Sequence, residues 1–386
     1  MISDYRLVAK SWQTPFVVLL GGCLISLVGF GARSSYGLYL GPMTLDLNWT
    51  RETFALAMAL QNLFWGICLP LAGILVDRYG PLWVVIGGAL IYALGTFGMT
   101  WVESSGSLYL AGGILVGTGV AFTSFSLVTA TMVRVVGVQR RSLVMGLCTA
   151  AGSLGQVLYS PITQGMISNH GWSSALVVTA VSVCLIIPLA FMLPNDPRVR
   201  DENVVHTGSI GAMREAFAHR GFLLLTAGFF VCGFHVAFIT VHLPVYVSDL
   251  GLGSMVGAIA ISLIGIFNIV GSLLSGAFGQ RFSKKCGLSG IYAARAVTLL
   301  VFLVAPKSEL TIYIFAATMG LLWLSTVPLT AGIIAQVFGI RYMATLYGFV
   351  FLSHQIGSFI GVWMGGYIYD LTGSYDLMWQ AGIILG

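Results

Sequence analysis

Long apolar runs that recur along the whole chain are the feature that most restricts its fold. Eleven of them can be read in the 386 residues, and a helix needs about 20 residues to cross roughly 30 Å of hydrocarbon. Backbone groups in lipid must be hydrogen-bonded inside the protein, and runs of this length favour helices over the shorter strands of a barrel. We place the spans at 15–40, 54–76, 81–102, 107–133, 142–167, 173–193, 221–247, 254–279, 287–305, 310–337 and 343–369. A twelfth begins near Tyr375 and has only about twelve residues before Gly386, too few to cross.

The composition agrees with an integral membrane protein. Hydrophobic residues make up 57% of the chain and charged residues only 8%, whereas a soluble domain carries about 25% charged residues. We therefore expect an all-α membrane protein. The six cysteines are interpreted as small buried hydrophobes, because no arrangement of them indicates a disulfide framework or a thiolate site. No metal and no cofactor are predicted.

The distribution of basic residues predicts the orientation of the spans. Short cytoplasmic loops retain Lys and Arg, and with the N-terminus in the cytoplasm the outer loops hold only Arg51 and Lys307. The cytoplasmic segments then hold Arg6, Lys10, Arg78, Arg134, Arg140, Arg141, Arg198, Arg200, Arg214, Arg220, Arg281, Lys284, Lys285 and Arg341. The net charge of +5 therefore reflects topology, and no nucleic-acid partner is predicted. We expect a multi-pass protein of the cell (inner) membrane.

The chain reads as two similar halves. Its longest polar stretch predicts a cytoplasmic linker at 194–220, between an N-terminal six-helix bundle at 1–193 and a C-terminal bundle at 221–386. Three pairs of landmarks recur at nearly one spacing of 202 or 203 residues: Gly73 with Gly276, Gly146 with Gly348, and Gly171 with Gly373. A duplicated unit of this kind is typical of transporters whose substrate sits at the membrane midplane between the halves.

Two arginines, Arg33 and Arg295, fall inside predicted spans, and none of the thirteen acidic residues does. A guanidinium stays protonated in proteins, and an arginine at mid-bilayer costs about 2.5–3.5 kcal/mol on insertion scales, so each needs compensation. We hypothesise that a travelling anion supplies it, which makes the chain a carrier of small carboxylate-bearing solutes. The alternative for Arg33 is that its long stem reaches the outer headgroups, although its Gly, Ser and Tyr neighbours suit a cavity wall better.

The segment 73–80 resembles the signature of the major facilitator superfamily between helices 2 and 3. This resemblance implies two six-helix bundles around a central cavity, with the twelfth helix incomplete here. It also implies a conformational latch in which Asp77 and Arg78 act with Arg281 at the matching end of the second half. Two uncharged residues replace the usual basic pair, and Gln280 stands where the second copy of the motif would carry an acid.

A narrower resemblance is to the monocarboxylate porter and oxalate/formate antiporter branch of that superfamily. It depends on residues 140–146, on 150–153 at the entry of helix 5, and on 370–375 after helix 11. The acidic Gly-Gly-Trp opening of the branch is absent, and residues 10–13 stand in its place. The resemblance implies transport of a small organic anion, by anion exchange or by proton-coupled symport.

Site residues follow from this branch position by position. Arg33 stands where the monocarboxylate porters carry a substrate-binding lysine, and its planar guanidinium keeps the anion recognition. Asn268 and Ser272 occupy the helix 8 positions of an Asp and an Arg, so Arg295 either replaces that cation or ties helices together. His354 stands where the oxalate/formate antiporter has a lysine. Gln61, Gln156 and Asn268 are polar residues at membrane depth on helices that line the cavity in this superfamily, and Tyr36 belongs to its aromatic rim. The predicted substrate-binding set is Arg33, His354, Arg295, Tyr36, Asn268, Gln61 and Gln156.

Two histidines are candidates for proton coupling, His354 and His235, because a histidine changes charge between about pH 5 and 8. The alternative for each is a neutral ring hydrogen-bonded within the bundle. His242 is predicted to lie nearer the outer membrane interface.

The sequence thus predicts a secondary active transporter that works by alternating access. We expect the small organic anion, protons and the lipid bilayer as its partners, and a monomer. No enzyme is predicted, because the chain has no HExxH, no Gly-x-Ser-x-Gly and no buried acidic pair. The alternatives are a carrier of a neutral metabolite or drug with both arginines structural, and a transport-dead receptor or scaffold.

Overall fold

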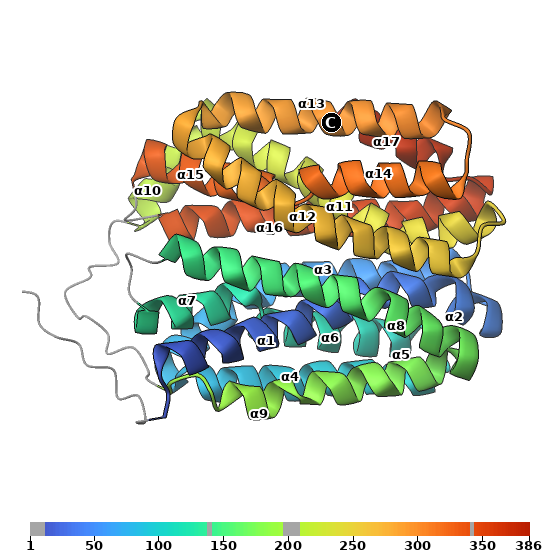
Figure 1. Cartoon of the computed structure of the whole chain (residues 1–386), viewed down its shortest axis with the longest axis horizontal. Coiled ribbons are helices and arrows are strands. Elements are labelled where there is room, and N and C mark those ends of the chain that lie inside the picture. The colour runs from blue at the N-terminus through green and yellow to red at the C-terminus, as the bar shows by residue number, and fades with distance from the viewer. Residues whose placement is uncertain (1–11, 137–140, 196–208, 340–342) are drawn as a thin grey trace, which may run out of the picture.

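The computed structural model describes residues 12–136, 141–195, 209–339 and 343–386. All regular elements within these ranges are helices. They form two bundles of roughly parallel helices, with α1 to α9, coloured blue to green, in one and α10 to α17, coloured yellow to red, in the other (Figure 1). The prediction of an all-α protein with two helical bundles is therefore confirmed.

The first bundle contains twelve helical elements in the described ranges. They are α1 (Pro15–Ser34), η1 (Tyr36–Tyr39), α2 (Leu40–Asp46), α3 (Arg51–Tyr79), α4 (Pro81–Gly98), η2 (Met99–Trp101), α5 (Ser105–Leu108), η3 (Tyr109–Leu115), α6 (Val116–Phe122), α7 (Phe125–Val136), α8 (Arg141–Cys184) and α9 (Ile186–Ala190). The predicted fifth and sixth spans both lie in the stretch α8 to α9, and α8 bends at Gly171, whose φ of 81° suits a residue without a Cβ.

The second bundle follows after residues outside the described part. Its helices are α10 (Ser209–Ala218), α11 (Arg220–Asp249), α12 (Ser254–Arg281), α13 (Lys284–Val304), α14 (Glu309–Leu322), α15 (Thr326–Phe338), α16 (Met343–Thr372) and α17 (Asp376–Leu385). Helix α10 falls within the predicted linker 194–220, of which 196–208 lie outside the described residues. The boundaries 1–193 and 221–386 stay a prediction.

Ten helical regions of the described chain are long and apolar enough to cross a membrane. One of them, Leu143–Ala190, holds two predicted spans, so these regions account for the eleven runs read from the sequence. The short apolar helix α17 corresponds to the start of the twelfth. The protein is a multi-pass membrane protein.

The two ends of the bundle are named here by the residues of α3. The "Arg51 end" is where α3 begins, α11 ends at Asp249 and α16 ends at Thr372; the "Arg78 end" is where α3 ends and α12 reaches Arg281. The halves meet where α3 packs on α16 and where α8 packs on α12. The positive-inside argument predicts that the Arg51 end is the outer one.

Two spans, the fourth and the tenth, are broken near their middle. The fourth runs through α5, η3 and α6 and is broken at Thr123 and Ser124, before α7. The tenth consists of α14 and α15, which are separated by 323–325. Because the breaks stand about 200 residues apart, they occupy equivalent places in the two halves. The sequence did not predict them.

Close approach between α1 and α8 fixes the first helix in place. A Cβ on Gly155 would lie 2.0 Å from Leu27 O, and one on Gly31 would lie 2.9 Å from the Gly155 carbonyl carbon. Only glycines allow these two backbones to touch, as at small-residue interfaces in membrane proteins. This packing sets the position of the last turn of α1, where Arg33 lies.

Candidate functional site

Arg33 is held inside the protein by an amide and an aromatic ring. Its Nη2 donates to Asn62 Oδ1 at 2.5 Å, and its guanidinium carbon lies 4.5 Å from the centre of the Trp65 ring. Its Nε is buried and has no hydrogen-bond partner. In the described part of the chain no carboxylate pairs with it. The arginine is therefore not neutralised by any acid of the described residues, and its guanidinium lies against α3.

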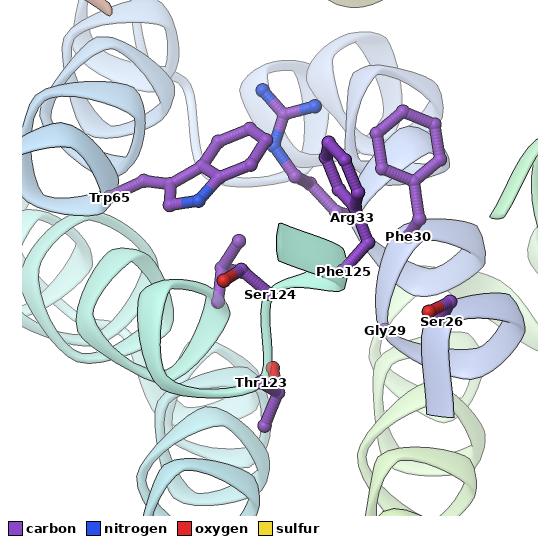
Figure 2. A pocket seen from close by; sticks show the side chains of 9 residues that line it. Ser26, Gly29, Phe30, Arg33, Trp65, Thr123, Ser124 and Phe125 are labelled. Atoms are coloured by element: carbon purple, nitrogen blue, oxygen red, sulfur yellow. The ribbon is translucent and has the colours of Figure 1, made fainter. Parts of the chain in front are cut away.

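Two small pockets flank Arg33, and its side chain lines both. The "Trp65 pocket" holds about 280 Å³ of empty space with its mouth included, and the "Tyr36 pocket" about 270 Å³. Polar and aromatic residues of the Trp65 pocket are Ser26, Phe30, Arg33, Trp65, Thr123, Ser124 and Phe125 (Figure 2). Polar residues of the Tyr36 pocket are Arg33, Tyr36, Gln61, Asn62 and Thr240.

Helical spacing explains which residues meet in the Trp65 pocket. Residues three, four and seven positions apart share one face of a helix, and Arg33 follows Ser26, Gly29 and Phe30 at these distances on α1. The break of the fourth span adds Thr123 to Phe125, which would face different ways in an unbroken helix. Residues of α1 and of the break between α6 and α7 thus line one pocket together with Trp65 of α3.

Besides Arg33, two more of the predicted binding residues line the Tyr36 pocket. The Tyr36 hydroxyl is 2.5 Å from Thr96 Oγ1, and Gln61 Nε2 donates to Gly112 O at 3.2 Å. This pocket is shared by both halves, because Thr240 comes from α11. Arg33, Tyr36 and Gln61 are therefore the predicted residues that the fold brings together.

Asn268 and Gln156 lie outside the two pockets, at the seam between the halves. Asn268 Nδ2 donates to Ser153 Oγ at 2.9 Å, and its Oδ1 accepts from Leu324 N–H at 3.0 Å. Gln156 Nε2 donates to Ile261 O at 2.8 Å. Both side chains connect α8 with the second half, and Asn268 already uses both of its amide atoms in these contacts.

Arg295 is fully buried on α13 and donates hydrogen bonds to backbone carbonyls at the break of the tenth span. Its Nε and Nη2 donate to Leu322 O at 3.2 and 2.7 Å, and Nη2 also donates to Trp323 O. The last carbonyls of a helix lack intrahelical partners and form the negative end of its dipole, so a cation is stabilised at the end of α14. Arg295 lines neither pocket, which favours the structural alternative.

The candidate histidines are buried and hydrogen-bonded. His235 Nε2–H donates to Gly382 O at 2.8 Å, and His354 Nδ1–H donates to Gln355 Oε1 at 3.2 Å. Neither ring lines the pockets around Arg33. His242 is fully buried, and Val362 O and the Tyr375 hydroxyl, which also binds Arg51, lie at its two ring nitrogens. Its position near the outer membrane interface stays a prediction.

The predicted latch residues lie at the Arg78 end. Asp77 and Arg78 are in the last turn of α3, Arg78 lies 5.2 Å from the centre of the Tyr79 ring, and Arg281 ends α12 as an exposed side chain. The described contacts do not join Arg281 to the first half. The latch stays a prediction.

An ion-paired cluster at the Arg51 end was not predicted. Arg51 binds Asp249 through both terminal nitrogens at 2.6 and 2.7 Å, and its guanidinium lies 3.6 Å from the centre of the Tyr369 ring. Asp370 accepts from the N–H groups of Arg51 and Glu52 at 3.1 and 2.7 Å, so it caps α3 from the other half. These contacts hold the halves together at this end.

Trp65 is the functional candidate that sequence reasoning missed. It is 6% exposed, stacks on Arg33, and its Nε1 has no hydrogen-bond partner. A tryptophan within an apolar run gives no signal of its own. The one available clue was its position three residues after Asn62, on the face of α3 that carries the polar pair Gln61 and Asn62.

Long apolar helices in two bundles, with an unneutralised arginine between two internal pockets, define a polytopic membrane protein of transporter type. The family model described as Major Facilitator Superfamily matches residues 22–362, and the chain belongs to this family. The superfamily predicted from the motif is confirmed.

Curated relatives are similar over nearly the whole chain. Monocarboxylate transporter 13 of Rattus norvegicus is 26% identical over 367 residues, which cover 93% of this chain and 83% of that protein. The oxalate:formate antiporter of Oxalobacter formigenes is 25% identical over 367 residues, covering 94% and 86%. The branch resemblance is thus also supported, at low identity.

Solved structures share the fold. A bacterial homologue of the human lysosomal transporter Spinster, inward-facing and unoccupied, has a TM-score of 0.77 at 16% identity and covers 94% of this chain and 84% of its own. The D-xylose-proton symporter has a TM-score of 0.72 at 14% identity, covering 96% and 95%. The major facilitator fold is confirmed.

Proposed function

We propose that this protein is a secondary transporter that carries a small organic anion, a mono- or dicarboxylate, by alternating access, with Arg33 as the anion anchor. The observation that carries the proposal is that Arg33 lies between two pockets, is paired with no acid among the described residues, and keeps an unpartnered Nε. A half-buried cation in this state is best compensated by an anionic ligand.

A small solute is supported by the relatives. Both a monocarboxylate transporter and an oxalate:formate antiporter are named for small carboxylates. The pockets at Arg33 are narrow and do not enclose the roughly 300–1,000 Å³ of a site for a drug-sized ligand.

Charge balance favours exchange over one-way movement. The empty carrier has to reorient with an uncompensated guanidinium, whereas the anion-loaded carrier is locally neutral, so the loaded form crosses its barrier more easily. Proton-coupled symport is the second mode, with His354 or His235 as the titrating residue. Uptake driven by an imposed pH gradient without internal substrate separates the two modes.

The test of the proposal is uptake of labelled formate, oxalate, lactate and pyruvate into proteoliposomes. Arg33→Ala should abolish saturable uptake, and Arg33→Lys should retain part of it because the charge remains. Arg220→Ala is the matched control, because Arg220 is an exposed arginine at the start of α11. Wild-type rates and affinity in Arg33→Ala would remove Arg33 from the mechanism.

A second function, transport of a neutral solute, has one observation in its favour. Asn62 and the Trp65 ring already contact the guanidinium of Arg33, as they would if the arginine only tied α1 to α3. Replacing each substrate of the panel by its amide or alcohol analogue decides between the two. Equal competition by the neutral analogues supports the neutral carrier, and specific binding without flux supports a receptor or scaffold.

We also propose the cellular arrangement read from the sequence. The N-terminus and the Arg78 end face the cytoplasm of the cell (inner) membrane, the chain acts as a monomer, and Asp77, Arg78 and Arg281 latch the cytoplasmic ends of the halves. Labelling of single cysteines at Lys307 and Arg78 with an impermeant reagent on intact cells tests the orientation. Reaction at position 78 alone would reverse it.

A further inference from the structure

We propose that the carboxylate of the transported anion binds in the Trp65 pocket, between Arg33, the indole N–H of Trp65 and the N-terminus of α7. This carboxylate-binding site, called the seat below, uses Arg33 and therefore rests on the function proposed above. It adds the second wall of the binding site, made from α3 and the broken fourth span, and it assigns a binding role to Trp65 and Ser124.

The pocket contains two buried donors without partners. Trp65 Nε1 can only donate, is in a side chain that is 6% exposed, and has no acceptor among the described residues. The same holds for the Nε atom of Arg33. Figure 2 shows the nitrogen-bearing edge of the indole turned toward Ser124, on the opposite side of the pocket. Two unmatched donors at one small pocket call for a ligand with two acceptor atoms.

The part of the pocket next to Ser124 is the start of a helix. Ser124 O accepts from the N–H groups of Leu127 and Val128, each at 3.1 Å, so the twelve-residue α7 begins next to Ser124. Its first N–H groups have no intrahelical acceptor by position, and the positive end of its dipole lies there. Half-helices that begin at membrane depth hold anionic substrate groups in other transporters in this way.

The equivalent break in the second half shows which hydrogen-bond partner the first break lacks. Trp65 and Asn268 are 203 residues apart, which is the spacing of the landmarks Gly73 and Gly276 on the same two helices. Ser124 corresponds to Leu324, since Leu324 O accepts from Val327 N–H at 3.0 Å in the same pattern.

At the second break the protein supplies its own acceptor. Asn268 Oδ1 accepts from Leu324 N–H at 3.0 Å. At the first break a donor-only indole stands in that position. At the tenth span the protein therefore supplies an acceptor at this position, whereas at the fourth span the indole N–H has no acceptor among the described residues. A carboxylate of the substrate supplies it and neutralises Arg33 at the same time.

The test is binding of labelled formate and oxalate to the purified full chain, followed by uptake in proteoliposomes. Trp65→Phe keeps the ring on Arg33 and removes the donor, so the Kd should rise at least about tenfold, as for a lost hydrogen bond to a charged group. Trp379→Phe is the matched control, because Trp379 is also buried with an unpartnered Nε1 but lines neither pocket. Its Kd should stay within twofold of the parent value.

A second variant places a fixed acid in the seat. Ser124→Asp should abolish anion binding, because its carboxylate occupies the position of the ligand next to Arg33. Ser105→Asp is its control, because Ser105 is an exposed serine at the start of the same span and lines neither pocket. Thermal unfolding of each variant in detergent verifies that it is folded, and chloride in place of the organic anion tests whether the seat selects a carboxylate.

The outcomes separate this site from the proposed function. Loss of binding in Arg33→Ala with unchanged Kd in both Trp65→Phe and Ser124→Asp leaves the anchor intact and overturns the seat. Unchanged binding in Arg33→Ala overturns both. Equal displacement of formate by chloride overturns the carboxylate assignment, and weaker binding in Trp65→Phe with none in Ser124→Asp supports it.

Discussion

The ion pair at the Arg51 end should set how often that end opens. In Asp249→Asn the bidentate partner of Arg51 loses its charge while its size is kept. Exposed pairs contribute about 0.2–1 kcal/mol, but this one is bidentate and its side chains are only 15% and 30% exposed, so less of its attraction is screened. We take about 1–2 kcal/mol, which corresponds to roughly a 5- to 30-fold larger open population.

Cysteine accessibility measures this population. Thr240 lines the Tyr36 pocket, so Thr240→Cys should react with a maleimide mainly when the Arg51 end is open. The two exposed native cysteines, Cys184 and Cys286, are replaced by serine in the background. In detergent, the reaction in Asp249→Asn should be about 5- to 30-fold faster than in the parent, and the gain should shrink when high salt weakens the pair in the parent.

A control variant at the Arg51 end tests whether the faster labelling depends on a contact between the two halves. Asp46 accepts from Trp172 Nε1 at 2.9 Å, and both residues belong to the first half. Asp46→Asn should therefore leave the labelling rate of Thr240→Cys unchanged. Rates within twofold of the parent for Asp249→Asn, or an equal gain in Asp46→Asn, would refute the idea that Arg51 and Asp249 hold this end closed.

Three further predictions concern stability, packing and proton coupling. Arg295→Gln should lower the stability in detergent by about 2–4 kcal/mol, because buried carbonyls at the end of α14 lose charged donors; a changed KM in the surviving protein would instead make Arg295 a ligand residue. Gly155→Ala should cost about 1–3 kcal/mol, since its Cβ would meet Leu27 O, whereas Gly165→Ala on the same helix meets nothing within 4 Å and should be neutral or slightly stabilising in thermal unfolding. His354→Asn should flatten the pH dependence of uptake between about pH 5 and 8 if His354 carries the coupled proton, and an unaltered profile with normal rates would exclude it.

Most of the fold could be predicted from the sequence because each membrane span is a local property. An apolar run of 20 residues has to become a helix in lipid, whatever its neighbours are. The breaks of the fourth and tenth spans could not be predicted in this way. Residues 122–125 contain no Gly or Pro, and the break at 323–325 is held by Asn268 and Arg295, which lie on two other spans.

The site was predictable only in part, for a related reason. Arg33 is conspicuous, because a single charge in an apolar run has a large cost wherever it faces. Its partner Trp65 is apolar by composition, and only the three-dimensional contact gives its N–H a meaning. Asn268 and Gln156 were grouped with Arg33 as polar residues at similar depth, yet depth alone does not distinguish the wall of a pocket from the seam between α8 and α12.

The difference between the two broken spans suggests how occupancy is coupled to movement. In the second half Asn268 supplies an acceptor to the break, whether or not substrate is present. In the first half the N–H groups of Arg33 Nε and Trp65 Nε1 have no acceptor among the described residues, and a buried donor without an acceptor is costly. Substrate in the Trp65 pocket would therefore act on the first half, where α1, α3 and the fourth span meet. Hydrogen bonds from the ligand to the first half give the loaded and the empty carrier different energies. The two forms therefore reorient at different rates.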